Sequence, residues 1–175
     1  LQNLGCEVKW KAYFDEENKT WSKDKPVKGF LFRGTIDRVI LNKATGQVWL
    51  VDYKLGTSQA QSFGAWAKDN NWQLMYYTLA LEAGWVENLS AYPVEVAQYW
   101  VVSKWEIKKG YSHGILDDFV LKSKKDLLQT EQKQKLSEKF NEFIAQQVAQ
   151  IRERQFPPQP KEEKTCRKCQ WSLVC

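Results

Sequence analysis

The stretch from Leu31 to Lys54, LFRGTIDRVILNKATGQVWLVDYK, constrains the fold of this chain more than any other. Apolar and β-branched residues dominate residues 27–41 and resume over residues 47–52, as is typical of β-strands. Between them, residues 43–46 (KATG) have the composition of a turn. The stretch therefore predicts two antiparallel strands joined by a short connection.

Among the polar side chains in these predicted strands are Asp37, Asp52 and Lys54. Burying an unpaired charge is costly, so two carboxylates in an apolar setting need a compensating cation. Mg²⁺ prefers oxygen ligands and is commonly held by one or two carboxylates with water and phosphate. We expect Asp37, Asp52 and the backbone carbonyl of Tyr53 to hold such an ion.

Lys54 lies two residues after Asp52, and the period of a strand places both on the same side. From there the amine can orient a water or stabilise charge on a phosphate. This predicts a metal-dependent phosphodiesterase site. The alternative is a surface ion pair between Asp52 and Lys54, worth under about 1 kcal/mol.

The other periodicities predict one mixed α/β domain with the order β-β-β-α-β-α. Asp69 or Asn70 can cap the first helix, and Gly84 can end it. The predicted elements besides the hairpin are a strand at 6–14, an exposed polar loop at 15–26, a helix at 69–83, a strand at 95–103 extended or paired by 104–109, and a helix at 129–155.

Composition sets few further limits. The chain has 175 residues, of which 43% are hydrophobic and 27% charged, enough for one globular domain. Its net charge of +5 is compatible with a polyanionic partner, and ordinary solvated charge explains it equally well. No apolar run approaches the roughly 18 residues of a membrane span. The first residue is Leu1 and the only methionine is Met75, so we expect a piece of a longer protein. We expect that protein to be cytoplasmic.

Gln73 and Tyr77 lie four residues apart on the first predicted helix and therefore share a face. One interpretation is polar decoration of the helix surface. The other is contact with the lysine of the metal site or with a DNA phosphate.

The segments GTIDRV, VWLVDYKLG and QLMYYTLAL follow one another within residues 29–83. Together they resemble the RecB-like branch of the PD-(D/E)XK nucleases, found in helicase–nuclease recombination complexes and CRISPR-associated exonucleases. In this resemblance Asp37 is the first acidic ligand, Asp52 and Lys54 form the D/E-x-K motif, and Gln73 and Tyr77 form the Q-x-x-x-Y motif.

The resemblance implies a restriction-endonuclease-like α/β fold, with a mixed central sheet flanked by helices. It also implies an Mg²⁺- or Mn²⁺-dependent deoxyribonuclease, an exonuclease acting in DNA repair or recombination. The implied partners are DNA, as single strands or ends, and a helicase domain or subunit, with no membrane. The implied location is the nucleoid.

One departure from the family pattern concerns the metal shell. Family members carry a helix before the first core strand, with a histidine or glutamate that completes the shell, whereas this chain begins at the strand. His113, the sole histidine, is better explained as a loop residue, and Glu7 could stand in for the missing ligand. The alternative function is therefore a nuclease-like DNA-binding or scaffold module of weak or no activity.

Three cysteines, Cys166, Cys169 and Cys175, cluster after the proline-rich segment FPPQP. Their spacing suits a metal or cluster site that needs a fourth ligand. The pattern resembles the iron–sulfur staple of the same branch, which implies a structural [4Fe–4S] centre. Cys6 is the only thiol left as fourth ligand, and zinc is the competing occupant. We expect a nuclease core at 1–156 and a tail at 157–175 that packs back on it.

Aromatic and basic residues permit two interpretations each. Several tryptophans could stack the bases of a single strand or simply fill the core, and several lysines could follow a phosphate backbone or form a solvated face. The tryptophans are Trp66, Trp72, Trp85, Trp100 and Trp105, and the lysines are Lys104, Lys108, Lys109, Lys122, Lys124 and Lys125.

Overall fold

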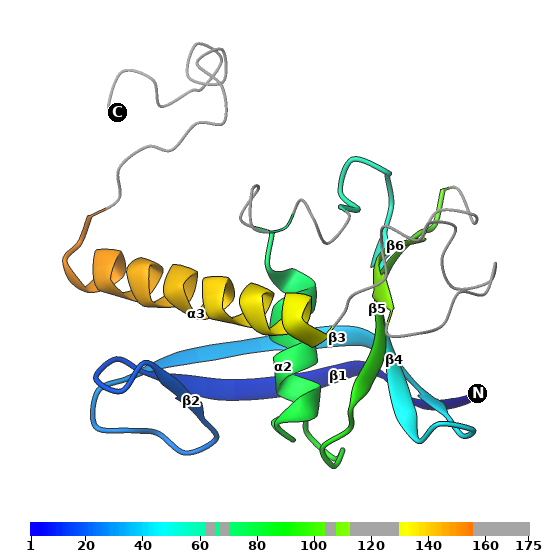
Figure 1. The fold of residues 1–175 in the computed structure, drawn as a ribbon, viewed down its shortest axis with the longest axis horizontal. Helices are drawn as coiled ribbons and strands as arrows, with labels where there is room; N and C mark the ends of the chain where they lie inside the picture. Colours follow the sequence, from blue (N-terminus) through cyan, green and yellow to red (C-terminus); the bar gives the residue numbers. More distant parts are fainter. Residues whose placement is uncertain (62–65, 67–70, 104–107, 113–129, 156–175) are drawn as a thin grey trace, which may run out of the picture.

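The computed structural model describes residues 1–61, 66, 71–103, 108–112 and 130–155 (Figure 1). The elements of this part are, in order, β1 (Gln2–Asp15), β2 (Thr20–Ser22), β3 (Gly29–Asn42), β4 (Gln47–Lys54), α2 (Gln73–Glu82), β5 (Val94–Val101), β6 (Lys108–Ser112) and α3 (Thr130–Arg152). The strands form one sheet in the order β2-β1-β3-β4-β5-β6. Only β4 and β5 pair in parallel. The predicted mixed α/β architecture is confirmed.

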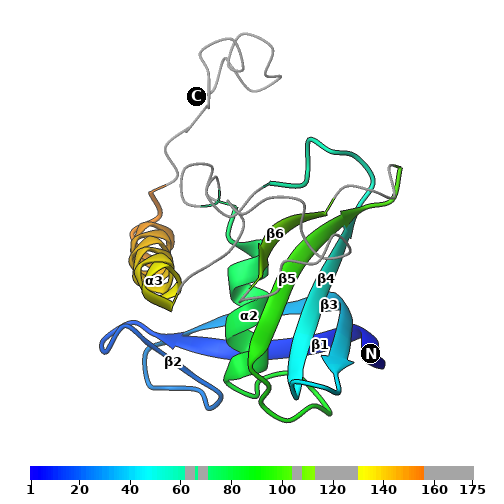
Figure 2. The same cartoon turned by 45° about the vertical axis from the view of Figure 1, so that its right-hand side comes forward.

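The two halves of the sheet run in different directions. β1 and β3 cross the molecule, whereas β4 and β5 stand upright beside them (Figures 1 and 2). Side chains of α2 and of α3 belong to the same large hydrophobic cluster, together with Ile36, Leu50 and Ala97 of the sheet. Both described helices therefore cover one face, and a smaller cluster around Trp49 and Val96 lies apart from this core.

The predicted hairpin is confirmed as β3 and β4. Their antiparallel register runs from the pair Asn42–Gln47 to the pair Arg38–Val51. In the turn, Gly46 has a φ of +72°, which glycine adopts without strain. The Asn42 side chain accepts the Ala44 amide at 3.1 Å and so stabilises the turn.

The polar connection predicted at residues 15–26 is wrong in part, because it contains the short strand β2, which pairs with β1. Trp21 of β2 stacks on Phe140 of α3 at 5.9 Å and 3°, and its Nε1 donates to Asn141 at 2.9 Å. Packing against a distant helix thus holds this polar segment in the sheet. With β2 and β6, the order becomes β-β-β-β-α-β-β-α.

Both predicted helices are confirmed, but their boundaries differ, since α3 ends at Arg152 and not at the predicted residue 155. α2 begins at Gln73 with Trp72 as N-cap and no side-chain cap, so the predicted start at residue 69 is wrong, and Asp69 and Asn70 lie outside the described residues. The predicted stop is confirmed, since Gly84 follows the helix with a φ of +70°. No helix in the described part is long and apolar enough to cross a membrane.

Along β1 the predicted alternation is confirmed only in the second half. Trp10, Ala12 and Phe14 are buried, whereas Cys6 is exposed. Glu7, with a φ of +50°, interrupts the alternation between them. The stacking interpretation is wrong for Trp66, Trp72 and Trp85, which are buried in the core, and Trp105 lies outside the described residues.

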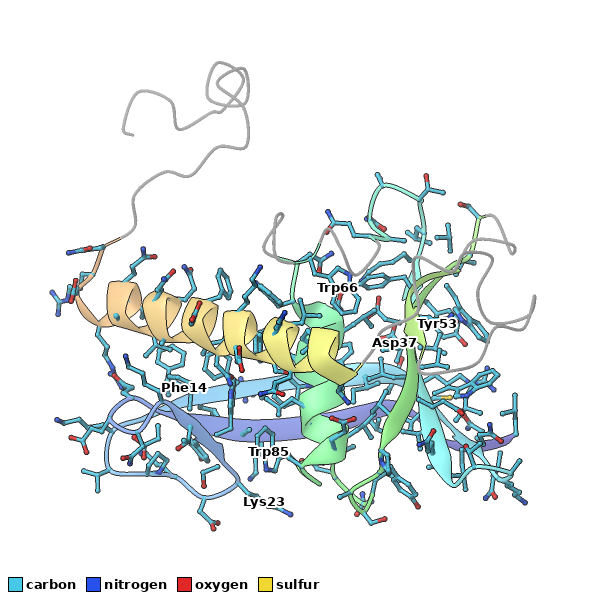
Figure 3. The ribbon with its side chains drawn as sticks, viewed as in Figure 1. Phe14, Lys23, Asp37, Tyr53, Trp66 and Trp85 are labelled. Carbon is cyan, nitrogen blue, oxygen red and sulfur yellow. The ribbon has the colours of Figure 1, made fainter. Side chains whose placement is uncertain are left out.

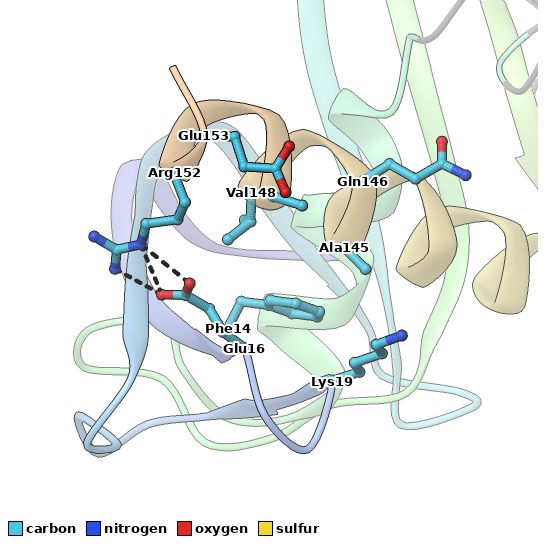
Figure 4. A pocket seen from close by; sticks show the side chains of 9 residues that line it. Phe14, Glu16, Lys19, Ala145, Gln146, Val148, Arg152 and Glu153 are labelled. Atoms are coloured by element: carbon cyan, nitrogen blue, oxygen red, sulfur yellow. Dashed lines mark hydrogen bonds and ion pairs between the residues drawn. The ribbon is translucent and has the colours of Figure 1, made fainter. Parts of the chain in front are cut away.

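An ion pair between Arg152 and Glu16 connects the end of α3 to the end of β1. The Arg152 guanidinium donates three hydrogen bonds to the Glu16 carboxylate just after β1, the shortest at 2.6 Å (Figure 4). A pocket of about 370 Å³ lies between these elements, with Phe14 and Val148 on its walls. The contact brings residues near the two ends of the described chain together.

Candidate active site

Asp52 lies at the carboxyl end of β4 and is only 2% exposed. It sits there because Val48, Leu50 and Val51 bury the strand and because β5 pairs alongside, with Tyr99 opposite Asp52. The Lys54 Nζ lies 2.6 Å from Asp52 Oδ2, and that oxygen is buried with no further partner in the described part. The lysine is thus the counter-ion of an otherwise costly buried charge.

Gln73, the first residue of α2, connects this ion pair to the helix. Its Oε1 accepts from Lys54 Nζ at 2.8 Å, and its Nε2 donates to Asp52 Oδ1 at 2.8 Å. The same Nε2 lies 2.9 Å from the hydroxyl of Tyr77, one turn later. Two pairs of residues from separate segments therefore form one hydrogen-bonded cluster: Asp52 and Lys54 of β4, and Gln73 and Tyr77 of α2.

Burial perturbs the titration of this cluster. It raises the pKa of the Asp52 carboxyl, the Lys54 ammonium opposes that shift, and the charge of Asp37 adds to it. Burial also raises the pKa of Tyr77, and the Asp52 and Asp37 charges contribute in the same direction. The Tyr77 hydroxyl consequently stays protonated.

Asp37 lies next to the cluster, where β3 and β4 separate. The ladder ends at the pair Arg38–Val51, and Asp37 and Asp52 are the next residues on their strands. The Asp37 Oδ2 accepts the backbone N–H of Tyr53 at 2.8 Å, so the two labelled residues lie together in Figure 3. The contact thus involves the backbone N–H of Tyr53, and not the Tyr53 carbonyl that the sequence analysis names as a ligand.

Two residues of the site were missed by the sequence analysis, Tyr99 and Asn71. The Lys54 Nζ lies 5.2 Å from the centre of the Tyr99 ring, and the Tyr99 hydroxyl donates to Asn71 Oδ1 at 3.2 Å. Burial and the Asp52 charge raise the pKa of Tyr99. No sequence signal marks Tyr99, because it is one of several aromatic residues in an apolar strand; only the pairing with β4 brings it to the lysine.

The oxygen donors at this site fit a hard divalent cation. Asp37 and Asp52 supply two carboxylates from adjacent strand ends, and such an ion completes its shell with water and phosphate. In the described part of the chain, however, no group of three or more His, Cys, Asp or Glu could hold a metal. Glu7 is exposed on β1, and His113 lies outside the described residues.

The predicted iron–sulfur ligands cannot be placed together. Cys166, Cys169 and Cys175 lie outside the described residues, as do Lys104, Lys122, Lys124 and Lys125. Cys6 is a free, exposed thiol whose Sγ lies 3.8 Å from Asn3 Nδ2.

A mixed sheet in which an acidic residue and a lysine end one strand, with a helix covering that edge, is the restriction-endonuclease-like α/β fold. Comparison with protein families matches residues 2–175 to the PD-(D/E)XK nuclease superfamily. The chain belongs to this superfamily and is a nuclease domain. Comparisons with curated proteins and with solved structures found no match.

Proposed function

We propose that this chain is a metal-dependent deoxyribonuclease domain of the RecB-like branch, with Asp37, Asp52, Lys54, Gln73 and Tyr77 at its active site. The observation that supports this most is the buried Asp52–Lys54 pair that Gln73 holds from α2. An isolated surface pair would be worth little, whereas a buried pair with further hydrogen bonds is held in a defined geometry.

Asp37 and Asp52 would hold Mg²⁺ or Mn²⁺ through their side chains, with the Tyr53 carbonyl as the further ligand. A cation there supplies charge neutralisation of the phosphate and acidifies a bound water. Lys54 orients the attacking water, because its ammonium is within hydrogen-bonding distance of both Asp52 and Gln73. Gln73 fixes the position of Lys54 and Asp52, and Tyr77 holds the amide of Gln73.

The proposed biological role is more specific than the nuclease class, and it depends on the resemblance of the three motifs to the RecB-like branch. We propose exonuclease action on single strands or DNA ends, in repair or recombination, beside a helicase domain or subunit. The tail at 157–175 is proposed to bind a structural [4Fe–4S] cluster through Cys166, Cys169 and Cys175, with Cys6 as fourth ligand and zinc as the alternative occupant. The core would then comprise residues 1–156.

The test is cleavage of end-labelled single-stranded DNA in Mg²⁺ or Mn²⁺ by the wild type, Asp52→Ala and Lys54→Ala. We expect both variants to lose cleavage while their circular dichroism is unchanged. Lys23→Ala, an exposed residue away from the cluster, is the matched control. Cleavage by Lys54→Ala at the wild-type rate contradicts the assignment.

The absence of a third acidic or histidine ligand in the described part favours a second candidate function. It is the nuclease-like DNA-binding or scaffold module without activity. This candidate predicts DNA binding by the wild type with no cleavage at any Mg²⁺ or Mn²⁺ concentration.

A further inference from the structure

A hollow of about 400 Å³ opens beside the catalytic cluster, between β3 and the start of α2. Its walls include Gln73 and Tyr77, so one end of the hollow reaches the residues that hold Lys54 and Asp52. The register along β3 shows why the space exists: β4 pairs with β3 only from Arg38 onward, which leaves Arg33 and Gly34 beside α2 without a β4 neighbour.

Two residues that line this hollow carry buried hydrogen-bond donors with no partner in the described part. The indole Nε1 atoms of Trp10 and Trp72 are buried with no partner in the described part, and the two side chains are 5% and 4% exposed. Tyr76 also lines the hollow, and burial raises its pKa to about 12, so its hydroxyl remains a donor. Unpaired buried donors are costly and call for an acceptor.

The charged side chain among the described lining residues of this hollow is a cation, Arg33. Arg33 is exposed on its wall, makes no ion pair within the described part, and no carboxylate is among the described lining residues. Residues that carry three donors, together with Arg33, therefore line a space with no carboxylate among its described lining residues. Arginine recognises phosphate through paired N–H donors.

A second hollow of about 470 Å³ shares Trp10, Arg33 and Gly34 with the first. Lys9 and Lys11 line it, and in the register of β1 and β3 Lys11 lies directly opposite Arg33. Like charges placed opposite one another destabilise a sheet. Glu87 is the one acidic side chain among its described lining residues. The basic wall therefore continues away from the catalytic cluster.

Apolar surface accompanies the donors in the first hollow. Phe32 and Tyr76, both partly exposed, stack at 5.8 Å and 28° on its wall. A space of this size holds one nucleotide-sized ligand, with an aromatic surface for a base and donors for a phosphate. A base inside a duplex cannot reach such a wall, because it is paired and stacked, whereas an unpaired one can.

We propose that the first hollow binds a nucleotide of single-stranded DNA next to the scissile phosphate. Arg33, Tyr76 and the indole donors hold its phosphate, and Lys9 and Lys11 hold the phosphates that follow. This inference rests on the proposed function, because Gln73 connects the hollow to the catalytic cluster.

The test measures binding without metal, so that it does not depend on cleavage. Fluorescence anisotropy with labelled oligodeoxythymidine of about 12 nucleotides compares the wild type with Arg33→Ala over a range of salt concentrations. We expect Kd to rise about tenfold and the salt slope of log K to decrease by about 0.7, the value for one phosphate contact. Lys23→Ala, an exposed lysine elsewhere, is the control and keeps both values.

A second variant tests the donors without changing the fold. Tyr76→Phe removes only a hydroxyl and should raise Kd for the single strand about threefold, whereas Tyr92→Phe, just before β5, should not. Equal Kd and salt slope for Arg33→Ala and the wild type overturn the proposal, as does failure of the wild type to bind the oligonucleotide. An equal loss with duplex DNA overturns the assignment to a single strand.

The two proposals fail separately. Binding that depends on Arg33 in a protein that never cleaves DNA overturns the proposed function and leaves the subsite intact. Normal cleavage with binding independent of Arg33 overturns the subsite alone.

Discussion

Two carboxylates are buried on the neighbouring strands β4 and β5, at opposite ends of the parallel pair. Asp52 is 2% exposed and Glu95 is 3% exposed. Glu95 is the extra residue where the register shifts, and its Oε2 accepts from Trp49 Nε1 at 2.8 Å and Asn42 Nδ2 at 3.1 Å. Neutral donors therefore stabilise Glu95, whereas Asp52 relies on a lysine and retains a buried oxygen with no other partner.

This difference distinguishes a carboxylate with fixed neutral partners, Glu95, from the carboxylate that we propose to be reactive, Asp52. Burial alone does not mark a functional residue, since both groups are buried equally. A carboxylate whose counter-charge is a lysine, beside a second carboxylate, can exchange that partner for a metal ion or a phosphate. Glu95 accepts from the Trp49 indole and the Asn42 amide, so its hydrogen-bond partners are already in place.

The largest expected effect compares two isosteric neutralisations. Asp52→Asn should lower metal-dependent DNA cleavage about 10² to 10³-fold, because a cation at this site contributes several kcal/mol to the transition state. Glu95→Gln should leave the cleavage rate within about twofold, since it removes a charge far from the phosphate. Single-turnover rates of both proteins measure this, and a large loss in Glu95→Gln breaks the comparison.

The free energy of unfolding should depend on whether residue 95 still offers an acceptor oxygen. Glu95→Ala leaves the Trp49 and Asn42 donors without this acceptor and should lower the free energy of unfolding by about 2–3 kcal/mol. Glu95→Gln keeps an acceptor oxygen and should cost under about 1 kcal/mol. Urea unfolding measures both values, and a loss as small for Ala as for Gln contradicts the structural role of Glu95.

Tyr77→Phe should have a smaller effect on the reactive end. It removes the hydroxyl next to Gln73 Nε2, a neutral hydrogen bond worth about 1 kcal/mol, and should lower the cleavage rate about fivefold. Tyr92→Phe is the matched control. An unchanged rate in Tyr77→Phe shows that Gln73 holds its position without the tyrosine.

The smallest effect is a pH dependence of stability without metal. Burial raises the pKa of Asp52 above its ordinary 3.8. Between 3.8 and the raised pKa, the folded chain therefore binds a proton more tightly than the unfolded chain. Ionisation of Asp52 therefore destabilises the fold as pH rises through the raised pKa. The unfolding free energy of the wild type minus that of Asp52→Asn should therefore fall as pH rises above 3.8 and through the raised pKa. A constant or rising difference contradicts the shift.

Much of this was predictable from local patterns. The hairpin, the strand at β5, both helices and the polar residues Asp37, Asp52 and Lys54 are all predicted from the sequence, because strand and helix periods are local properties. The strand β2 was missed because Trp21 packs against Phe140, about 120 residues away. Likewise, nothing in the sequence distinguishes Glu95 from other charged residues. Only the tertiary structure shows that it is buried and accepts from the Trp49 indole.

The amino-acid sequence by itself determined on which kind of element each candidate site residue lies, and it predicted which residues carry the chemistry, since these follow from residue type and short-range spacing. Only the tertiary structure decided that β4 pairs in parallel with β5, that Gln73 reaches both Asp52 and Lys54, and that β3 leaves a donor-lined hollow beside α2. The physical reason is that pairing and packing depend on contacts between segments distant along the chain, which no local period encodes.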